Sequence, residues 1–145
     1  MEDFINRIDL TEFSTKVDEL KSRIASIIVG QESAVELILT ALLADGHVLI
    51  EGVPGVAKTL LAKLTAKLID ANYSRIQFTP DLMPSDVLGT SVFNVKKGEF
   101  EFHQGPIFSE LVLIDEINRA PAKTQAALFE VMEERQVTIE GLRGK

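Results

Sequence analysis

Cysteine is absent from this sequence of 145 residues, and its absence excludes disulfide bonds, thiolate metal sites and thiol nucleophiles. Long apolar runs are absent too. The longest mainly apolar stretch, 37–44, is interrupted by Thr40 and followed by Asp45, whereas a bilayer-spanning helix needs ~20 apolar residues. The N-terminus also lacks the positive region and the apolar core of a secretory signal. We therefore expect a cytoplasmic protein that has no membrane partner.

Basic residues are outnumbered by acidic ones, with 15 Lys and Arg against 22 Asp and Glu and a formal net charge of −7. This balance argues against broad electrostatic binding to nucleic acids, so no nucleic-acid partner is expected. The two histidines, His47 and His103, have no metal-ligand partners at suitable spacing and are interpreted as structural or surface residues. The apolar share of 46% is ordinary, and the length is that of one compact globular domain.

Three segments in the first half of the chain carry apolar residues at the spacings of three and four that are typical of helices. They are 11–28, 31–44 and 59–69. Thr11 or Ser14 is expected to cap the first helix, and a left-handed glycine at Asp45-Gly46 is expected to end the second. The second helix is apolar over most of its surface, so we expect it to be well buried.

Short apolar runs predict strands at 47–50, 74–79 and 111–114. Because a helix separates the first two runs, they favour a parallel sheet with a right-handed crossover. One helical turn is expected at 85–88, a longer helix over 121–135, and an extended segment from residue 137.

A β-hairpin is predicted between the second and third apolar runs. The segments 91–95 and 99–103 partly alternate polar and apolar residues on either side of Lys96-Lys97-Gly98. We expect this hairpin to protrude. It is either a solvated surface feature or a contact surface for a partner, where the two lysines would meet an acidic substrate.

A glycine-containing loop lies between the first predicted strand and the third predicted helix. Its sequence, Gly52-Val-Pro-Gly55-Val-Ala57-Lys58-Thr59, resembles a phosphate-binding P-loop in which Ala57 replaces the usual second glycine. The backbone N–H groups of such a loop surround the β-phosphate at a helix N-terminus. Lys58 would reach the β- and γ-phosphates, and Thr59 would bind Mg²⁺. The alternative is a Gly/Pro turn that precedes a helix by chance.

Two carboxylates follow the apolar run 111–114 directly. Asp115-Glu116 would lie at the C-terminal edge of a parallel sheet, where ligands gather in open α/β folds. We expect Asp115 to hold Mg²⁺ through water and Glu116 to act as general base toward the attacking water. An ordinary acidic turn is the alternative for this pair alone. Together with the P-loop, the pair predicts an ATPase site in which Lys58 and Glu116 are catalytic.

Four segments together resemble MoxR-type AAA+ ATPases, namely 52–59, 77–89, 105–108 and 115–128. The resemblance starts at about Ile28, so the predicted domains are an N-terminal helical segment, 1–27, and a partial AAA+ nucleotide-binding core, 28–145. Alanine at position 57 also occurs in the family's pattern, and Val29-Gly30-Gln31-Glu32 is similar to the family's segment beside the adenine. The predicted ATP-binding residues are Val29, Gly30, Gly52, Pro54, Gly55, Val56, Ala57, Lys58, Thr59, Leu60 and Asp115, with Thr59 and Asp115 as metal ligands.

The resemblance implies an α/β fold, the P-loop NTPase sheet of AAA+ proteins, parallel and flanked by helices, with an inserted β-hairpin. It also implies ATP hydrolysis coupled to remodelling or maturation of client proteins. The expected assembly is a homo-oligomer, usually a hexameric ring, often with a von Willebrand factor A partner. In this fold a fourth strand lies between the first and the third. We expect the chain to stop before it, without the fourth and fifth strands, the sensors, the arginine finger and the lid, and so to hydrolyse ATP weakly by itself.

Two other functions stay open at this point. The chain is alternatively a non-hydrolysing nucleotide-binding or assembly module, or an ATP-driven nucleic-acid motor, because related AAA+ branches use similar hairpins on DNA. Asn118 and Arg119 either contact Glu116 or a neighbouring subunit, or they cap the following helix. By the resemblance, Gln77 or Thr79 restrains the catalytic glutamate.

Overall fold

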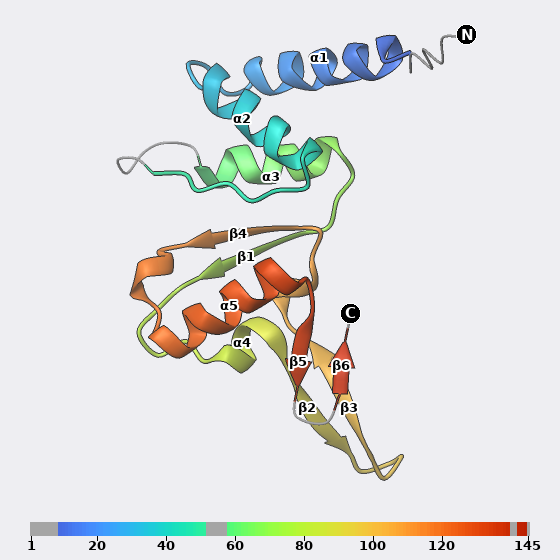
Figure 1. The fold of residues 1–145 in the computed structure, drawn as a ribbon, viewed down its shortest axis with the longest axis vertical. Helices are drawn as coiled ribbons and strands as arrows, with labels where there is room; N and C mark the ends of the chain where they lie inside the picture. Colours follow the sequence, from blue (N-terminus) through green and yellow to red (C-terminus); the bar gives the residue numbers. More distant parts are fainter. Residues whose placement is uncertain (1–8, 52–57, 140–141, 145) are drawn as a thin grey trace, which may run out of the picture. The chain divides into compact units, whose positions relative to one another are not determined.

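The computed structural model describes residues 9–51, 58–139 and 142–144. The chain forms two compact units, Met1–Leu68 and Ile69–Lys145, and Figure 1 shows their elements. The first unit contains α1 (Thr11–Ala25), α2 (Glu32–Leu43) and α3 (Lys58–Leu68). The second contains β1 (Tyr73–Gln77), α4 (Pro84–Leu88), β2 (Gly89–Asn94), β3 (Glu99–Gln104), β4 (Leu111–Asp115), α5 (Ala122–Glu134), β5 (Val137–Ile139) and β6 (Leu142–Gly144). Short 3₁₀ turns occupy Pro106–Phe108 and Ile117–Arg119.

The three predicted helices of the first unit are confirmed, but the predicted cap of α1 is wrong. Leu10 stands at the N-cap and makes no side-chain capping bond. Instead, the Asp9 carboxylate accepts hydrogen bonds from the Thr11 N–H, at 2.9 Å, and from the Thr11 hydroxyl, at 2.6 Å. These bonds favour the charged form and lower the pKa of Asp9. A carboxylate two residues upstream therefore satisfies an N–H group that the helix leaves open.

The core of the first unit is a cluster of five buried residues, Ile24, Ile28, Val35, Leu39 and Leu61. Helix α2 buries only one stripe of its apolar surface in this cluster, because Leu37 is 65% exposed. The expectation that this helix is well buried is therefore wrong. The residue that takes the left-handed conformation after α2 is Asp45, with φ 54°, and not the glycine that follows it.

The predicted strand at 47–50 is absent, since residues 46–51 are irregular. Val48 and Leu49 are open to solvent, with Leu49 75% exposed, and Ile50 is partly exposed. A strand exists only where its N–H and C=O groups meet those of a neighbour. The predicted sheet placed this segment beside a fourth strand, and none of the described residues supplies that strand.

The parallel pair β1 and β4 in the second unit confirms the predicted α/β sheet. The register runs from Tyr73 opposite Leu111 to Gln77 opposite Asp115. One face of this pair packs against α4 and α5, which lie on the same side of it in Figure 1. The buried cluster there consists of Ile76, Phe78, Val87, Ala120 and Leu128.

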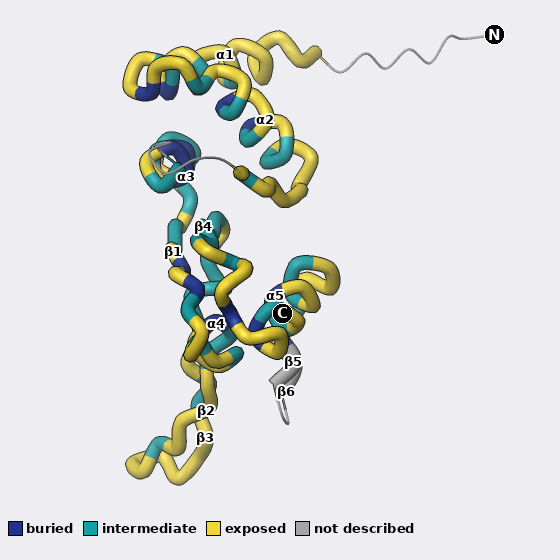
Figure 2. The backbone as a smooth tube through the Cα atoms, turned by 90° about the vertical axis from the view of Figure 1, so that its left-hand side faces the viewer, coloured by how far each residue is buried: buried dark blue, intermediate teal, exposed yellow. Residues whose placement is uncertain are grey.

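The antiparallel hairpin β2–β3 is confirmed where the sequence predicts it, and Figure 2 shows its largely exposed surface. At its base, Gly89 has a φ of 103°, and a Cβ atom there would come within 2.2 Å of the His103 carbonyl oxygen. A Cβ atom on Gly105 would come within 2.3 Å of the Val87 oxygen. Both positions therefore require glycine because the backbones approach closely.

Helix α5 and the short hairpin β5–β6 follow the sheet. The predicted helix over 121–135 and the extended segment from residue 137 are both confirmed. The hydroxyl of Thr124, in the first turn of α5, donates a hydrogen bond of 2.7 Å to the carbonyl of Leu82. This contact fixes α5 to the loop before α4. Among the described residues, no helix has the length and apolar character needed to cross a membrane.

Candidate active site

The predicted carboxylate pair lies at the C-terminal end of β4. Asp115 is the last residue of the strand, and its carbonyl oxygen accepts a hydrogen bond of 2.9 Å from the Phe78 N–H. The side chain of Asp115 is 21% exposed and that of Glu116 is 49% exposed. The parallel pairing with β1 thus holds both residues at the edge where open α/β sheets bind ligands.

Glu116 has a left-handed backbone, with φ 56° and ψ 41°. Residues other than glycine adopt this conformation rarely and at some cost in free energy. It turns the chain out of β4 into the 3₁₀ turn, where the Arg119 N–H donates to the Glu116 carbonyl at 2.8 Å. The chain therefore changes direction sharply between Asp115, the last residue of β4, and the 3₁₀ turn that follows Glu116.

Arg119 forms an ion pair with Glu116, with 3.3 Å between Nε and Oε2. Helix α5 begins after Pro121 and has no side-chain capping bond. Of the two interpretations of Arg119, the geometry therefore favours contact with Glu116 over capping of the helix. This contact is local, since the residues are three apart in one turn.

Arg75 contacts the other carboxylate, and the sequence analysis missed it. Its Nε donates a hydrogen bond of 2.6 Å to Oδ2 of Asp115, and a second bond of 3.3 Å reaches the Gln77 Oε1. Side chains alternate along a strand, so residues 73, 75 and 77 share one face of β1. A charged residue within a short, otherwise largely uncharged strand is the signal that could have identified Arg75.

Tyr73 lies on the same face of β1 as Arg75. Its hydroxyl is buried, and the described residues offer it no hydrogen-bond partner. Burial disfavours the phenolate and raises the pKa of Tyr73, while the positive charge of Arg75 lowers it and the negative charge of Asp115 raises it. This face of the sheet therefore combines a buried phenol with a charged pair.

The two residues that the resemblance offers as restraints on Glu116 have other partners. Gln77 accepts a bond from Arg75, and the Thr79 hydroxyl donates to Asp81 at 2.6 Å. The latter bond lowers the pKa of Asp81. The residue that contacts Glu116 is Arg119.

The described part of the predicted P-loop is the start of α3. Lys58 and Thr59 are the first two residues of this helix, and both are partly exposed. The unpaired N–H groups and the dipole of a helix N-terminus favour an anion there. Gly52, Pro54, Gly55, Val56 and Ala57 lie outside the described residues.

The remaining predicted ATP-binding residues are open to solvent. Val29 is 84% exposed and Leu60 is 47% exposed. Gly30 has a φ of 78°, and its N–H donates a hydrogen bond of 3.2 Å to the Glu32 carboxylate. Exposure makes these residues accessible to a ligand, and their roles stay predictions.

The two predicted metal ligands have the oxygen chemistry that Mg²⁺ prefers, a hydroxyl at Thr59 and a carboxylate at Asp115. Mg²⁺ commonly uses one or two protein ligands and keeps several waters, so a large cluster of ligands is not required. Within the described ranges, no group of three or more acidic, histidine or cysteine side chains is arranged to hold a metal. His47 and His103 are both exposed.

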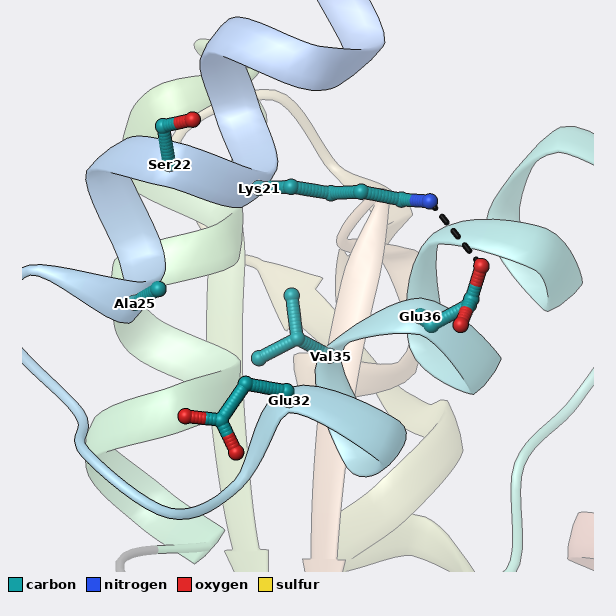
Figure 3. Close-up of a pocket in the computed structure, with 6 residues that line it drawn as sticks. All are labelled: Lys21, Ser22, Ala25, Glu32, Val35 and Glu36. Atoms are coloured by element: carbon teal, nitrogen blue, oxygen red, sulfur yellow. Dashed lines mark hydrogen bonds and ion pairs between the residues drawn. The ribbon is translucent and has the colours of Figure 1, made fainter.

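A shallow pocket in the first unit lies between α1 and α2 and contains no predicted site residue. Figure 3 shows its lining, with Lys21 of α1 reaching toward Glu36 of α2. The Lys21 Nζ and a Glu36 carboxylate oxygen are 3.0 Å apart. The charges that line the pocket therefore partly neutralise each other.

Comparison with known proteins gives a consistent result. Residues 47–145 match the family described as "ATPase family associated with various cellular activities (AAA)". The chain is similar to the chaperone MoxR1 of Mycobacterium tuberculosis, at 55% identity over 79% of this chain and 30% of the relative. It is also similar to the protein MoxR of Methylorubrum extorquens, at 32% identity over 89% of this chain and 39% of the relative.

A solved structure shares this fold. The crystal structure of a candidate ATPase from Cytophaga hutchinsonii matches with a TM-score of 0.80 and 46% sequence identity. The match covers 92% of this chain and 40% of the other protein. The chain thus spans about a third of the length of the curated relatives it matches.

Proposed function

Because the chain belongs to the ATPase family associated with various cellular activities (AAA), with MoxR-type relatives, we propose that it binds ATP with Mg²⁺ and contributes the hydrolytic carboxylates of a MoxR-type ATPase. One observation carries this proposal most directly. Asp115 and Glu116 end a parallel strand at the sheet edge, and each carboxylate has its own arginine partner. An ordinary acidic turn would not require two separate arginines to hold adjacent carboxylates.

Each residue of the predicted site has a defined task in this proposal. Lys58 neutralises charge on the β- and γ-phosphates, and the backbone of the loop 52–57 donates hydrogen bonds to them. Thr59 and Asp115 hold Mg²⁺, which supplies charge neutralisation at the phosphate oxygens. Leu60, with Val29 and Gly30, contacts the rest of the nucleotide.

Glu116 is the proposed general base. Its carboxylate, half exposed and at the sheet edge, takes a proton from the attacking water. In the absence of nucleotide, Arg119 forms an ion pair with this carboxylate. The 3.3 Å contact is weak enough for Glu116 to turn from Arg119 toward water when the site is filled.

The wider activity of the protein is also part of the proposal. The relative from M. tuberculosis is named a chaperone, which supports remodelling or maturation of client proteins as the purpose of ATP hydrolysis. We further propose a homo-oligomer, a hexameric ring in the full-length protein, that works in the cytoplasm with a von Willebrand factor A partner. The exposed hairpin β2–β3 is the surface that would meet a partner or client.

The test compares three variants in nucleotide binding and in phosphate release. Lys58→Ala should lose ATP binding, whereas Glu116→Gln should bind ATP and release no phosphate. Lys67→Ala, in the last turn of the same helix, is the matched control and should behave like the unmodified chain. Both the chain and its full-length parent should be measured, because this chain by itself is expected to hydrolyse ATP weakly.

The outcomes distinguish the proposal from its rivals. Binding of ATP without phosphate release from the parent would favour a non-hydrolysing nucleotide-binding or assembly module. Stimulation of release by DNA or RNA would favour a nucleic-acid motor, which the net charge of −7 does not support. Equal binding by Lys58→Ala and the unmodified chain would overturn the assigned site.

A further inference from the structure

Arg75 is the polar partner of the carboxylate assigned to the metal. Its Nε lies 2.6 Å from Oδ2 of Asp115, which is the geometry of a strong, charge-assisted hydrogen bond. The two residues come from neighbouring parallel strands and are 40 positions apart in the sequence. The bond therefore exists only because the register places residue 77 opposite residue 115 and so brings residue 75 within reach.

An Asp115 oxygen that accepts a hydrogen bond from the Arg75 guanidinium is less available to bind a cation or a water molecule held by that cation. A positive charge at 2.6 Å also repels a second cation that approaches the same carboxylate. In the absence of metal, Arg75 therefore binds a carboxylate oxygen of Asp115 that Mg²⁺ would use.

Arg75 also has an alternative partner. Its Nη2 lies 3.3 Å from the Gln77 Oε1, and its side chain is 49% exposed. The guanidinium can therefore turn from Asp115 toward Gln77 and water without leaving its charge buried. This second acceptor makes the contact with Asp115 reversible.

We propose that Arg75 is a positioning residue that competes with Mg²⁺ for the Asp115 carboxylate and thereby sets the Mg²⁺ concentration at which the site binds nucleotide. The inference rests on the proposed function, because it takes Asp115 as a metal ligand. An ion pair whose arginine is 49% exposed contributes little to folding. Removing Arg75 should therefore change the metal dependence of the site more than the stability of the chain.

The experiment titrates Mg²⁺ into the full chain with a fixed concentration of a fluorescent ATP analogue. Arg75→Met should lower the Mg²⁺ concentration for half-maximal binding by about three- to tenfold, because the competing charge is gone. Arg75→Lys, which keeps the charge, should lie closer to the unmodified chain. Arg23→Met, which removes an exposed arginine from α1, is the matched control and should change nothing.

Two further measurements separate competition from a structural role. In an Asp115→Asn background, Arg75→Met should no longer shift the Mg²⁺ dependence, since the shared partner is lost. The Nε–H signal of Arg75 in NMR spectra should move when Mg²⁺ and the ATP analogue are added together, as it leaves the carboxylate. A purely structural arginine would show neither effect. Thermal unfolding in EDTA checks that each variant is folded.

The result that overturns the inference is distinct from the one that overturns the proposed function. If the unmodified chain binds the analogue and Arg75→Met leaves its Mg²⁺ dependence unchanged or weakens it, competition by Arg75 is wrong and the assigned site stands. If the unmodified chain fails to bind the analogue at any Mg²⁺ concentration, the proposed function fails and the inference fails with it.

Discussion

The β1–β4 sheet and the β2–β3 hairpin belong to the same unit and are held together in different ways. The sheet joins strands that are distant in sequence. One of its faces packs against α4 and α5, where Phe78 and Leu128 are fully inaccessible to solvent. The hairpin joins neighbouring strands and is largely exposed (Figure 2). Its residue Phe100 is 68% exposed. The comparison teaches that the sheet depends on side-chain burial, whereas the hairpin depends on its backbone ladder and on local side-chain pairs.

The same difference separates the two surfaces to which we assign functions in the proposal. The sheet edge needs fixed geometry, because it orients Asp115 and Glu116, and it obtains this from a packed core. The hairpin carries few buried contacts, which suits a surface that adapts to a partner. Substitutions should therefore affect the two regions by different amounts.

The largest loss of stability is expected in the core between the sheet and helices α4 and α5. Leu128→Ala removes a fully buried side chain of α5 and should lower the free energy of unfolding by about 3 kcal/mol. Phe129→Ala, at the next position and 51% exposed, is the control and should cost less than about 1 kcal/mol. Urea denaturation measures both, and equal losses would contradict the burial argument.

The base of the hairpin should be the next most sensitive position. Gly89→Ala would place a Cβ atom 2.2 Å from the His103 oxygen at a φ of 103° and should cost about 2–3 kcal/mol. Gly98→Ala, at the hairpin turn, meets open space at a φ of 70° and should cost about 1 kcal/mol. If urea denaturation gives equal losses for the two variants, then the backbone conformation alone, and not the close approach, accounts for the need for glycine at position 89.

The aromatic pair on the hairpin should contribute less. The rings of Phe93 and Phe100 meet edge to face with centroids 5.1 Å apart, and Phe100→Ala should cost about 0.5–1 kcal/mol. Val95→Ala, at a residue 84% exposed, is the control. A loss near that of Leu128→Ala would show that the hairpin is packed against something in solution.

The smallest effect concerns one carboxylate on the opposite face of the hairpin. Lys97 donates to Glu101 at 2.5 Å and Asn94 donates at 2.9 Å, and these bonds lower the pKa of Glu101 from 4.5. Because the folded state favours the carboxylate, this contribution is present above the usual pKa and is lost as pH falls through the lowered one. In an NMR titration, Asn94→Ala should raise the pKa of Glu101.

A matched variant tests the cause of that shift. Ser91→Ala lies on the face of β2 that does not carry Asn94 and should leave the titration of Glu101 unchanged. If Asn94→Ala also leaves it unchanged, Lys97 alone holds the pKa down.

Two of the elements that were predicted correctly depend on local sequence alone. The hairpin follows from alternation around a glycine turn, and α5 follows from periodicity after Pro121. The strand at 47–50 was predicted from its apolar residues alone, but a strand also needs a neighbour. The cap of α1 was missed because Asp9 reaches past Leu10 to the helix, which spacing did not indicate.

The candidate site divides in the same way. Asp115 and Glu116 were predicted because an apolar run followed by two carboxylates is visible in one short stretch of sequence. Arg119 was singled out because it follows closely. Arg75 was missed because its contact with Asp115 crosses 40 positions, and only the register of two strands brings them together.

The sequence by itself thus determined the family, the β2–β3 hairpin and α5, and it predicted the two carboxylates, since each depends on residues within a short stretch of chain. The tertiary structure decided that Arg75 contacts Asp115 and which face of α2 is buried. These are consequences of packing and strand pairing, in which side chains distant along the chain share one small volume. For that reason the competition proposed between Arg75 and Mg²⁺ depends on the pairing of β1 with β4.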